Sequence, residues 1–107
     1  MSAADAYARV ALVGAGFIAD AHAEALTKRS STSLAAIVDP TSERADALAT
    51  KWHVPERRAD PAALGTDVAV DAAHVLVPPP LHRDVAEPLL ARGIDVLLEK
   101  PMAETAA

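Results

Sequence analysis

The sequence predicts a single α/β domain in which helices cover both faces of a doubly wound parallel sheet, giving three layers. Short apolar runs alternate along the 107 residues with segments whose apolar residues recur every three or four positions. This alternation of strands and helices is typical of βαβ units around a parallel sheet. The apolar runs are also continuous rather than alternating, which favours strands buried on both faces.

The first half of the chain accounts for two strands and two helices of this fold. In chain order we expect a strand over Arg9–Val13, a helix from Phe17 to about Arg29, a strand over Leu34–Val38, and a helix capped by Thr41 or Ser42. In the second helix apolar residues recur at i, i+3, i+4 and i+7, which places them on one face. Glycines end the first strand, and the pair Asp39-Pro40 ends the second.

The second half continues the same alternation with shorter elements. In chain order we expect a short strand within Val54–Ala59, a helical turn from Asp60-Pro61 that Gly65 stops, a strand over Val70–Val77, a helix that Gly93 ends, and a strand over Ile94–Leu98. Three prolines end the Val70–Val77 strand. Pro88 lies inside the last helix, where it removes one backbone donor and predicts a kink.

Composition excludes several classes of function. Fifteen acidic residues against ten basic ones give a net charge of −5, which disfavours a nucleic-acid-binding protein. The absence of cysteine excludes disulfides and thiolate metal sites, and no metal site is expected. No apolar run approaches the roughly 18 residues of a membrane helix. We therefore expect a cytoplasmic chain with no membrane or nucleic-acid partner.

The segment Gly14-Ala15-Gly16-Phe17-Ile18-Ala19 fits the dinucleotide-binding pattern G-x-G-x-x-[GA]. Gly14 would permit a sharp turn out of the strand, and Gly16 would let a pyrophosphate approach the backbone. The free amides of Phe17 and Ile18 would face that pyrophosphate at the positive end of the helix. The pattern alone is weak, because a plain strand–turn–helix without a ligand can carry it.

Asp39 strengthens the interpretation, since it lies 20 residues past Ala19 at the end of the second expected strand. A carboxylate there accepts hydrogen bonds from the adenosine ribose and repels a 2′-phosphate, so NAD is favoured over NADP. The alternative is that Asp39 only forms the turn or caps the next helix. Arg44 follows on that helix, where it is expected to be a solvated charge more than a phosphate ligand.

Two later segments, "VLVPPPLH" and "DVLLEKP", place polar or cyclic residues just past the carboxyl ends of strands, where open α/β sheets bind ligands. Together with the glycine turn, His22 and Asp39, they resemble the N-terminal Rossmann domain of the Gfo/Idh/MocA oxidoreductases. These are named after glucose–fructose oxidoreductase and inositol dehydrogenase. The resemblance covers roughly residues 8–104, and Glu99-Lys100-Pro101 is its most diagnostic part.

The resemblance implies an NAD-dependent oxidoreductase that acts on a secondary alcohol of a sugar or polyol. It implies the following cofactor-binding residues: Gly14, Gly16, Phe17 and Ile18 at the pyrophosphate, Asp39 at the adenosine ribose, Val77, Pro78 and His82 on the nicotinamide side, and Glu99 at the nicotinamide ribose. Lys100 would lie beside nicotinamide and substrate as the catalytic residue that assists proton movement at the carbinol.

Some residues depart from the family's pattern or have a plainer interpretation. Val77-Pro78-Pro79 stands where the family usually has Thr-Pro-Asn, so a hydroxyl and an amide are lost on the nicotinamide side. His82 is equally well explained as the first residue of a helix. His22, His53 and His74 are interpreted as structural residues.

The length of the chain leaves the activity open. The family's enzymes add a C-terminal α+β domain with the substrate pocket and the oligomer interface, and the 107 residues hold only the domain 1–107. We expect the whole enzyme to be a homo-oligomer and this piece to be inactive alone. The alternatives are a non-catalytic NAD(P)-binding module or an inactive truncated fragment.

Overall fold

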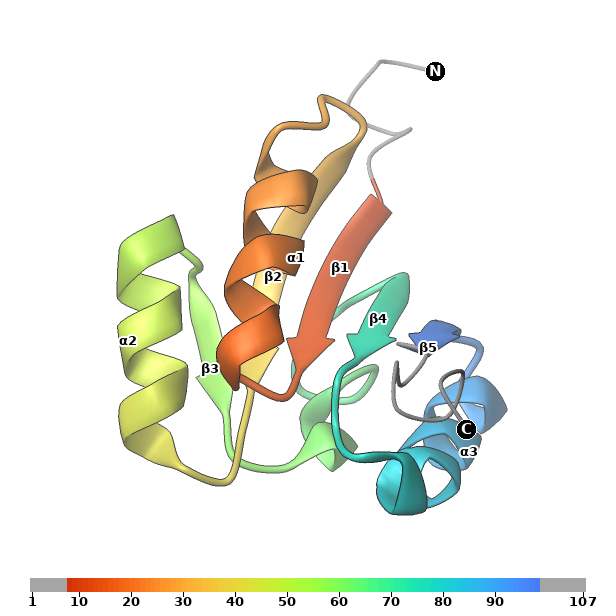
Figure 1. Ribbon diagram of the computed structural model, residues 1–107. Coiled ribbons are helices and arrows are strands. Elements are labelled where there is room, and N and C mark those ends of the chain that lie inside the picture. The colour runs from red at the N-terminus through yellow and green to blue at the C-terminus, as the bar shows by residue number, and fades with distance from the viewer. Residues whose placement is uncertain (1–7, 99–107) are drawn as a thin grey trace, which may run out of the picture.

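Five parallel strands form one sheet in the computed structural model, which describes residues 8–98 (Figure 1). In chain order the elements are β1 (Ala8–Val13), α1 (Phe17–Thr27), β2 (Thr32–Val38), α2 (Ser42–Trp52), β3 (Glu56–Arg58), the 3₁₀ turn η2 (Pro61–Ala63), β4 (Ala72–Val75), the 3₁₀ turn η3 (Pro79–Leu81), α3 (His82–Ala91) and β5 (Asp95–Leu98). Across the sheet the order is β3-β2-β1-β4-β5. The chain therefore winds outward from β1 first to one side and then to the other, which confirms the predicted doubly wound sheet.

The sheet separates two apolar cores because alternate residues of each strand point to opposite faces. Val10 and Leu12 of β1 belong to the core under α1 and α2, whereas Ala11 and Val13 belong to the core that η2 and α3 cover. Small residues let the helices lie close to the sheet: Ala19 and Ala23 of α1 and Ala73 of β4 are fully buried. The three-layer arrangement predicted from the sequence is confirmed.

The fourth strand is shorter than the sequence predicts. The apolar run Val70–Val77 contains only four strand residues, Ala72–Val75. They pair with Val10–Val13 of β1, and the amide of Leu76 makes one further bond to the carbonyl of Val13 at 2.8 Å. Beyond that point β1 has turned away at Gly14, so β1 offers no further residue to pair with. The prolines that follow have no N–H to donate and enter η3 instead.

α3 continues through Pro88 to Ala91. Pro88 lies on the exposed side of the helix, where water can satisfy the carbonyl that the missing N–H leaves without a partner. Among residues 8–98, every helix is too short or too polar to cross a lipid bilayer.

One carboxylate joins α1 to α2. Asp20 of α1 accepts a hydrogen bond from the indole Nε1–H of Trp52 at 2.9 Å and another from the ammonium of Lys51 at 3.1 Å. These two donors, the indole first, lower the pKa of Asp20 from its ordinary value of 3.8. The contact fixes the spacing of the two helices that flank the glycine turn.

We expect the stabilisation from Asp20 to disappear in acid. A carboxyl group whose pKa is lowered by folding stabilises the fold at pH values above its ordinary pKa, and the benefit is lost as the pH falls through the lower folded-state value. Wild type should therefore be more stable than Asp20→Asn at pH 6, and the difference should shrink as the pH falls below the ordinary pKa of 3.8. Urea denaturation followed by the fluorescence of Trp52, the sole tryptophan, measures both. A difference in stability that stays constant from pH 6 to pH 2.5 would contradict the role of the charge.

Candidate functional site

The carboxyl ends of β1, β2 and β4 meet at one edge of the sheet (Figure 1). β1 lies between the other two strands. The chain leaves β1 for α1 on one face of the sheet and leaves β4 for α3 on the other face. Such a reversal of winding opens a crevice at the strand ends, and open α/β sheets bind ligands there. The first residues past these three strands are Gly14, Asp39 and Leu76.

Gly14 is required both by its backbone conformation and by its neighbours. Its φ is +109°, a value that residues with a side chain rarely adopt. A Cβ on Gly14 would lie 3.2 Å from both the carbonyl carbon and the carbonyl oxygen of Leu76. Hydrogen bonds hold both partners, from the Gly14 amide to the Val38 carbonyl at 2.7 Å and from the Leu76 amide to the Val13 carbonyl at 2.8 Å.

Gly16 is different, because the fold itself does not require a glycine there. Its φ of −78° suits any residue, and the nearest atom to a Cβ would be Nη1 of Arg44 at 3.8 Å. The missing side chain leaves open space above the turn. Phe17 and Ile18 begin α1 just beyond, so their amides have no acceptor within the helix. A group with acceptor oxygens can therefore approach this backbone.

Asp39 is the one buried charged side chain among residues 8–98, with 5% of its surface exposed. One carboxylate oxygen accepts the Ala15 amide at 2.7 Å, and the other accepts the Thr41 amide at 2.8 Å. The carboxylate thus joins the glycine turn to the start of α2, whose expected cap Thr41 makes no side-chain capping bond. The turn-forming role considered for Asp39 is present, and each oxygen keeps a lone pair for a further donor.

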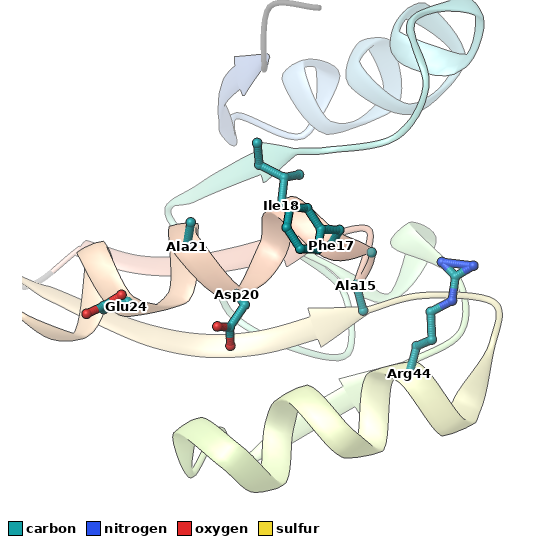
Figure 2. Close-up of a pocket in the computed structure, with 8 residues that line it drawn as sticks. Ala15, Phe17, Ile18, Asp20, Ala21, Glu24 and Arg44 are labelled. Atoms are coloured by element: carbon teal, nitrogen blue, oxygen red, sulfur yellow. The ribbon is translucent and has the colours of Figure 1, made fainter.

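Two hollows flank the glycine turn. The inner hollow, about 670 Å³, lies over the strand ends between Asp39, Asp60 and the segment from Leu76 to Pro78. The outer hollow, about 740 Å³, runs along α1 past Phe17, Asp20 and Glu24 (Figure 2). We assign the candidate binding site to the inner hollow, because it lies at the reversal of winding and contains the ends of β1, β2 and β4. Gly16 and Arg44 line both hollows.

The nicotinamide-side residues expected from the sequence fall partly in this site. Val77 and Pro78 line the inner hollow. His82 does not line it; its Nε2–H donates to the carbonyl of Val77 at 2.8 Å and so holds the segment after β4 in place. Glu99 and Lys100 lie outside the described residues 8–98.

Two residues acquire partners that the sequence interpretation missed. Nδ1 of His22 on α1 lies 3.1 Å from Nδ1 of His74 on β4, with the rings edge to face. One of the two nitrogens must carry a proton and the other must accept it. The histidines are 52 residues apart, so neither spacing nor composition signals their contact.

Arg44 also lies close to the glycine turn. It was expected to be a solvated charge, and it is exposed, but its guanidinium lies beside the glycine turn (Figure 2). The sequence shows only that Arg44 lies five residues past Asp39, near the start of the helix that follows the second strand. The sequence does not show the rotation of α2 that turns this side chain toward Gly16.

A doubly wound sheet with a glycine turn and an acidic residue at its reversal point defines a dinucleotide-binding Rossmann domain. The chain belongs to the Gfo/Idh/MocA oxidoreductases: the profile of the oxidoreductase family, NAD-binding Rossmann fold, matches residues 8–107. The resemblance noted from the sequence is confirmed, and so is NAD as the cofactor of this fold.

Several known proteins are similar to this chain in sequence or in structure. Inositol 2-dehydrogenase 4 of Saccharopolyspora erythraea is 37% identical over 95 residues, which are 88% of this chain and 28% of that protein. D-glucoside 3-dehydrogenase of Escherichia coli is 36% identical over 98 residues, 91% of this chain and 28% of that protein. The crystal structure of scyllo-inositol dehydrogenase from Lactobacillus casei with NAD(H) and scyllo-inositol superposes with a TM-score of 0.82 at 25% identity, covering 90% of this chain and 28% of that one. The chain thus spans under a third of the length of these relatives.

Proposed function

We propose that this chain is the cofactor-binding part of an NAD-dependent oxidoreductase that transfers hydride between nicotinamide and a secondary alcohol of a sugar or polyol. The open space above Gly16, at the reversal point of the sheet, carries the proposal. A Cβ there would meet no atom of residues 8–98 outside the turn closer than 3.8 Å, which leaves room for a ligand to approach the backbone. The substrate class follows from the relatives, which are inositol and glucoside dehydrogenases.

The residues present fit a dinucleotide. The turn from Gly14 to Gly16 and the amides of Phe17 and Ile18 would hold the pyrophosphate, helped by the positive end of the α1 dipole. Val77 and Pro78 would line the nicotinamide side of the cleft. His82 would act through Val77, whose carbonyl it holds.

Asp39 would set the preference for NAD. Its carboxylate borders the inner hollow and keeps free lone pairs that can accept from the adenosine ribose hydroxyls. The 2′-phosphate of NADP would meet this negative charge at short range, in a partly buried site where salt screens little.

Proton transfer is assigned to Lys100. Bound NAD would supply the hydride acceptor, and Lys100 would assist movement of the carbinol proton, with Glu99 positioning the nicotinamide ribose. Both residues follow β5, whose carboxyl end lies at the same edge of the sheet as those of β1 and β4. A pocket for the sugar or polyol and a homo-oligomer interface are proposed for the remainder of a full-length enzyme.

A second candidate is a module that binds the nucleotide without catalysis. The segment after β4 favours it, because the Val77 carbonyl is already engaged by His82 and Pro78 has no N–H to donate. Such a module would bind ADP-ribose as tightly as NAD. The oxidoreductase part should bind NAD more tightly, through its nicotinamide half.

Gly16→Ala tests the proposed function. The new Cβ fits the ligand-free fold, and the loss of a favourable N-cap residue of α1 is partly offset by the lower entropy of the unfolded chain, so the free energy of unfolding should change by no more than about 1 kcal/mol. The same Cβ would stand between a pyrophosphate and the backbone, so the affinity for NAD should fall at least about tenfold, or 1.4 kcal/mol. Isothermal titration of the 107-residue chain with NAD, NADP and adenosine measures this, and adenosine serves as the control without phosphates. The assignment fails if wild type binds neither dinucleotide at millimolar concentration, or if Gly16→Ala binds NAD unchanged.

A further inference from the structure

Arg44 lies where a ligand on the glycine turn would meet it. The residue belongs to the first turn of α2, and its side chain extends toward the turn that carries Ala15 and Phe17 (Figure 2). Nη1 is the nearest atom to the open space above Gly16, at 3.8 Å from the position of a Cβ. Because Arg44 borders both hollows, its guanidinium lies at the boundary between them.

The charge of Arg44 has no counterpart in the described part of the chain. Most other described arginines are engaged: Arg9 with Asp71, Arg57 with Asp46, Arg58 with Glu56 and Asp67, Arg83 with Glu87, and Arg92 with the carbonyls of Leu64 and Pro61. No hydrogen bond or ion pair joins the Arg44 guanidinium to any residue within 8–98. An exposed arginine held beside a backbone cradle, without a carboxylate of its own, is available to an anionic ligand.

The acidic residues around the two hollows make a cation there favourable for binding an anion. Asp39 and Asp60 line the inner hollow, and Asp20 and Glu24 line the outer one. Arg44 is the one cationic residue among the described residues that line either hollow. A pyrophosphate brings two further negative charges, and the N-terminus of α1 offers only about half a positive charge.

We propose that Arg44 binds the pyrophosphate of the dinucleotide from the α2 side, opposite the amides of α1, and so clamps it on the glycine turn. This rests on the proposed function. A guanidinium can donate two parallel hydrogen bonds to phosphate oxygens, which suits it to this role better than an ammonium group. The position over Gly16 favours the pyrophosphate over the 2′-phosphate of NADP, because the expected ribose position lies at Asp39.

Titrations of four ligands separate the groups that Arg44 could contact. NAD and ADP-ribose both contain the pyrophosphate, adenosine contains no phosphate, and NADP adds the 2′-phosphate. We expect Arg44→Ala to weaken NAD and ADP-ribose by the same factor of about ten, and to leave adenosine unchanged. Arg44→Lys should recover only part of the loss, because it keeps the charge without the paired donors.

Arg29→Ala is the matched control. Arg29 also lacks a carboxylate partner among residues 8–98, and its removal changes the net charge equally. It follows the far end of α1, about 16 Å of helix away from the glycine turn. Its replacement should leave the affinity for all four ligands unchanged.

The outcomes distinguish this inference from the proposed function. Failure of the wild-type chain to bind NAD would overturn both. If wild type binds NAD and Arg44→Ala binds it equally well, only the clamp is wrong. A loss confined to NADP would assign Arg44 to the 2′-phosphate, and an equal loss for adenosine would assign it to the adenine; either result overturns the clamp.

Discussion

Replacing Gly14 with alanine should lower the free energy of unfolding by about 3 kcal/mol. Part of the cost is backbone strain, because alanine would be forced to a φ of +109°. The rest is steric, since the Cβ would lie 3.2 Å from the carbonyl carbon and oxygen of Leu76. Leu76 cannot retreat without losing its 2.8 Å bond to Val13, which is the last hydrogen bond between β1 and the β4 side of the sheet.

Gly93→Ala provides the control for this prediction. Gly93 has a φ of +81°, and a Cβ there would meet no atom of the described residues 8–98 within 4 Å. Gly93→Ala therefore introduces backbone strain without a steric clash, and it should lower the free energy of unfolding by about 1 kcal/mol. Thermal unfolding followed by circular dichroism should place the melting temperature of Gly14→Ala roughly 8–16 °C below that of Gly93→Ala. Equal melting temperatures would show that Gly14 and Leu76 do not approach as closely as described.

Replacing Asp39 with alanine should destabilise the fold by a similar amount, about 3 kcal/mol, because it removes a buried carboxylate that accepts two part-buried hydrogen bonds, from the amides of Ala15 and Thr41. Asp39→Asn should lie between alanine and wild type, since the amide oxygen can serve one N–H but the amide nitrogen faces the other. Urea denaturation measures both variants. If Asp39→Ala is as stable as wild type, the hydrogen bonds from Ala15 and Thr41 to Asp39 do not stabilise the fold.

The structural role of Asp39 changes how its role in cofactor selection must be tested. A loosened turn would weaken NAD and NADP together, so a loss of NAD affinity alone proves nothing about the ribose. The ratio of the two dissociation constants is the informative quantity. We expect wild type to prefer NAD and both Asp39 variants to lose that preference, because neither carries a negative charge to repel the 2′-phosphate. An unchanged ratio would remove Asp39 from ribose recognition while leaving its structural role intact.

Much of the fold could be predicted because its signals are local. Buried parallel strands are recognisable as continuous apolar runs, and helices by apolar residues at spacings of three and four. Both kinds of segment appear at the predicted places. The strand predicted over Val70–Val77 was too long, because apolar residues continue in the sequence beyond the last residue of β4 that pairs with β1. That limit depends on where β1 turns, which is a property of a different segment.

The glycine motif is the part of the site that could be predicted, because its residues all lie within one turn of the chain. The sequence assigned different roles to Gly14 and Gly16, and their surroundings in the structure differ in the same sense: a Cβ on Gly14 would lie 3.2 Å from Leu76, whereas a Cβ on Gly16 would come no closer than 3.8 Å to Arg44. Asp39 was expected at the ribose, and its bonds to the glycine turn could not be foreseen. They depend on a side chain reaching across 24 residues of sequence.

The sequence by itself determined the succession of strands and helices, the glycine turn and the acidic residue that follows the second strand. These depend on apolar periodicity and on backbone conformations that neighbouring residues dictate. Only the tertiary structure decided that Asp39 fastens the turn, that His22 meets His74, and that Arg44 lies over Gly16. Each of these contacts joins separate elements. Whether such a contact forms depends on how the helices are rotated against the sheet, and the packing of the whole core determines that rotation.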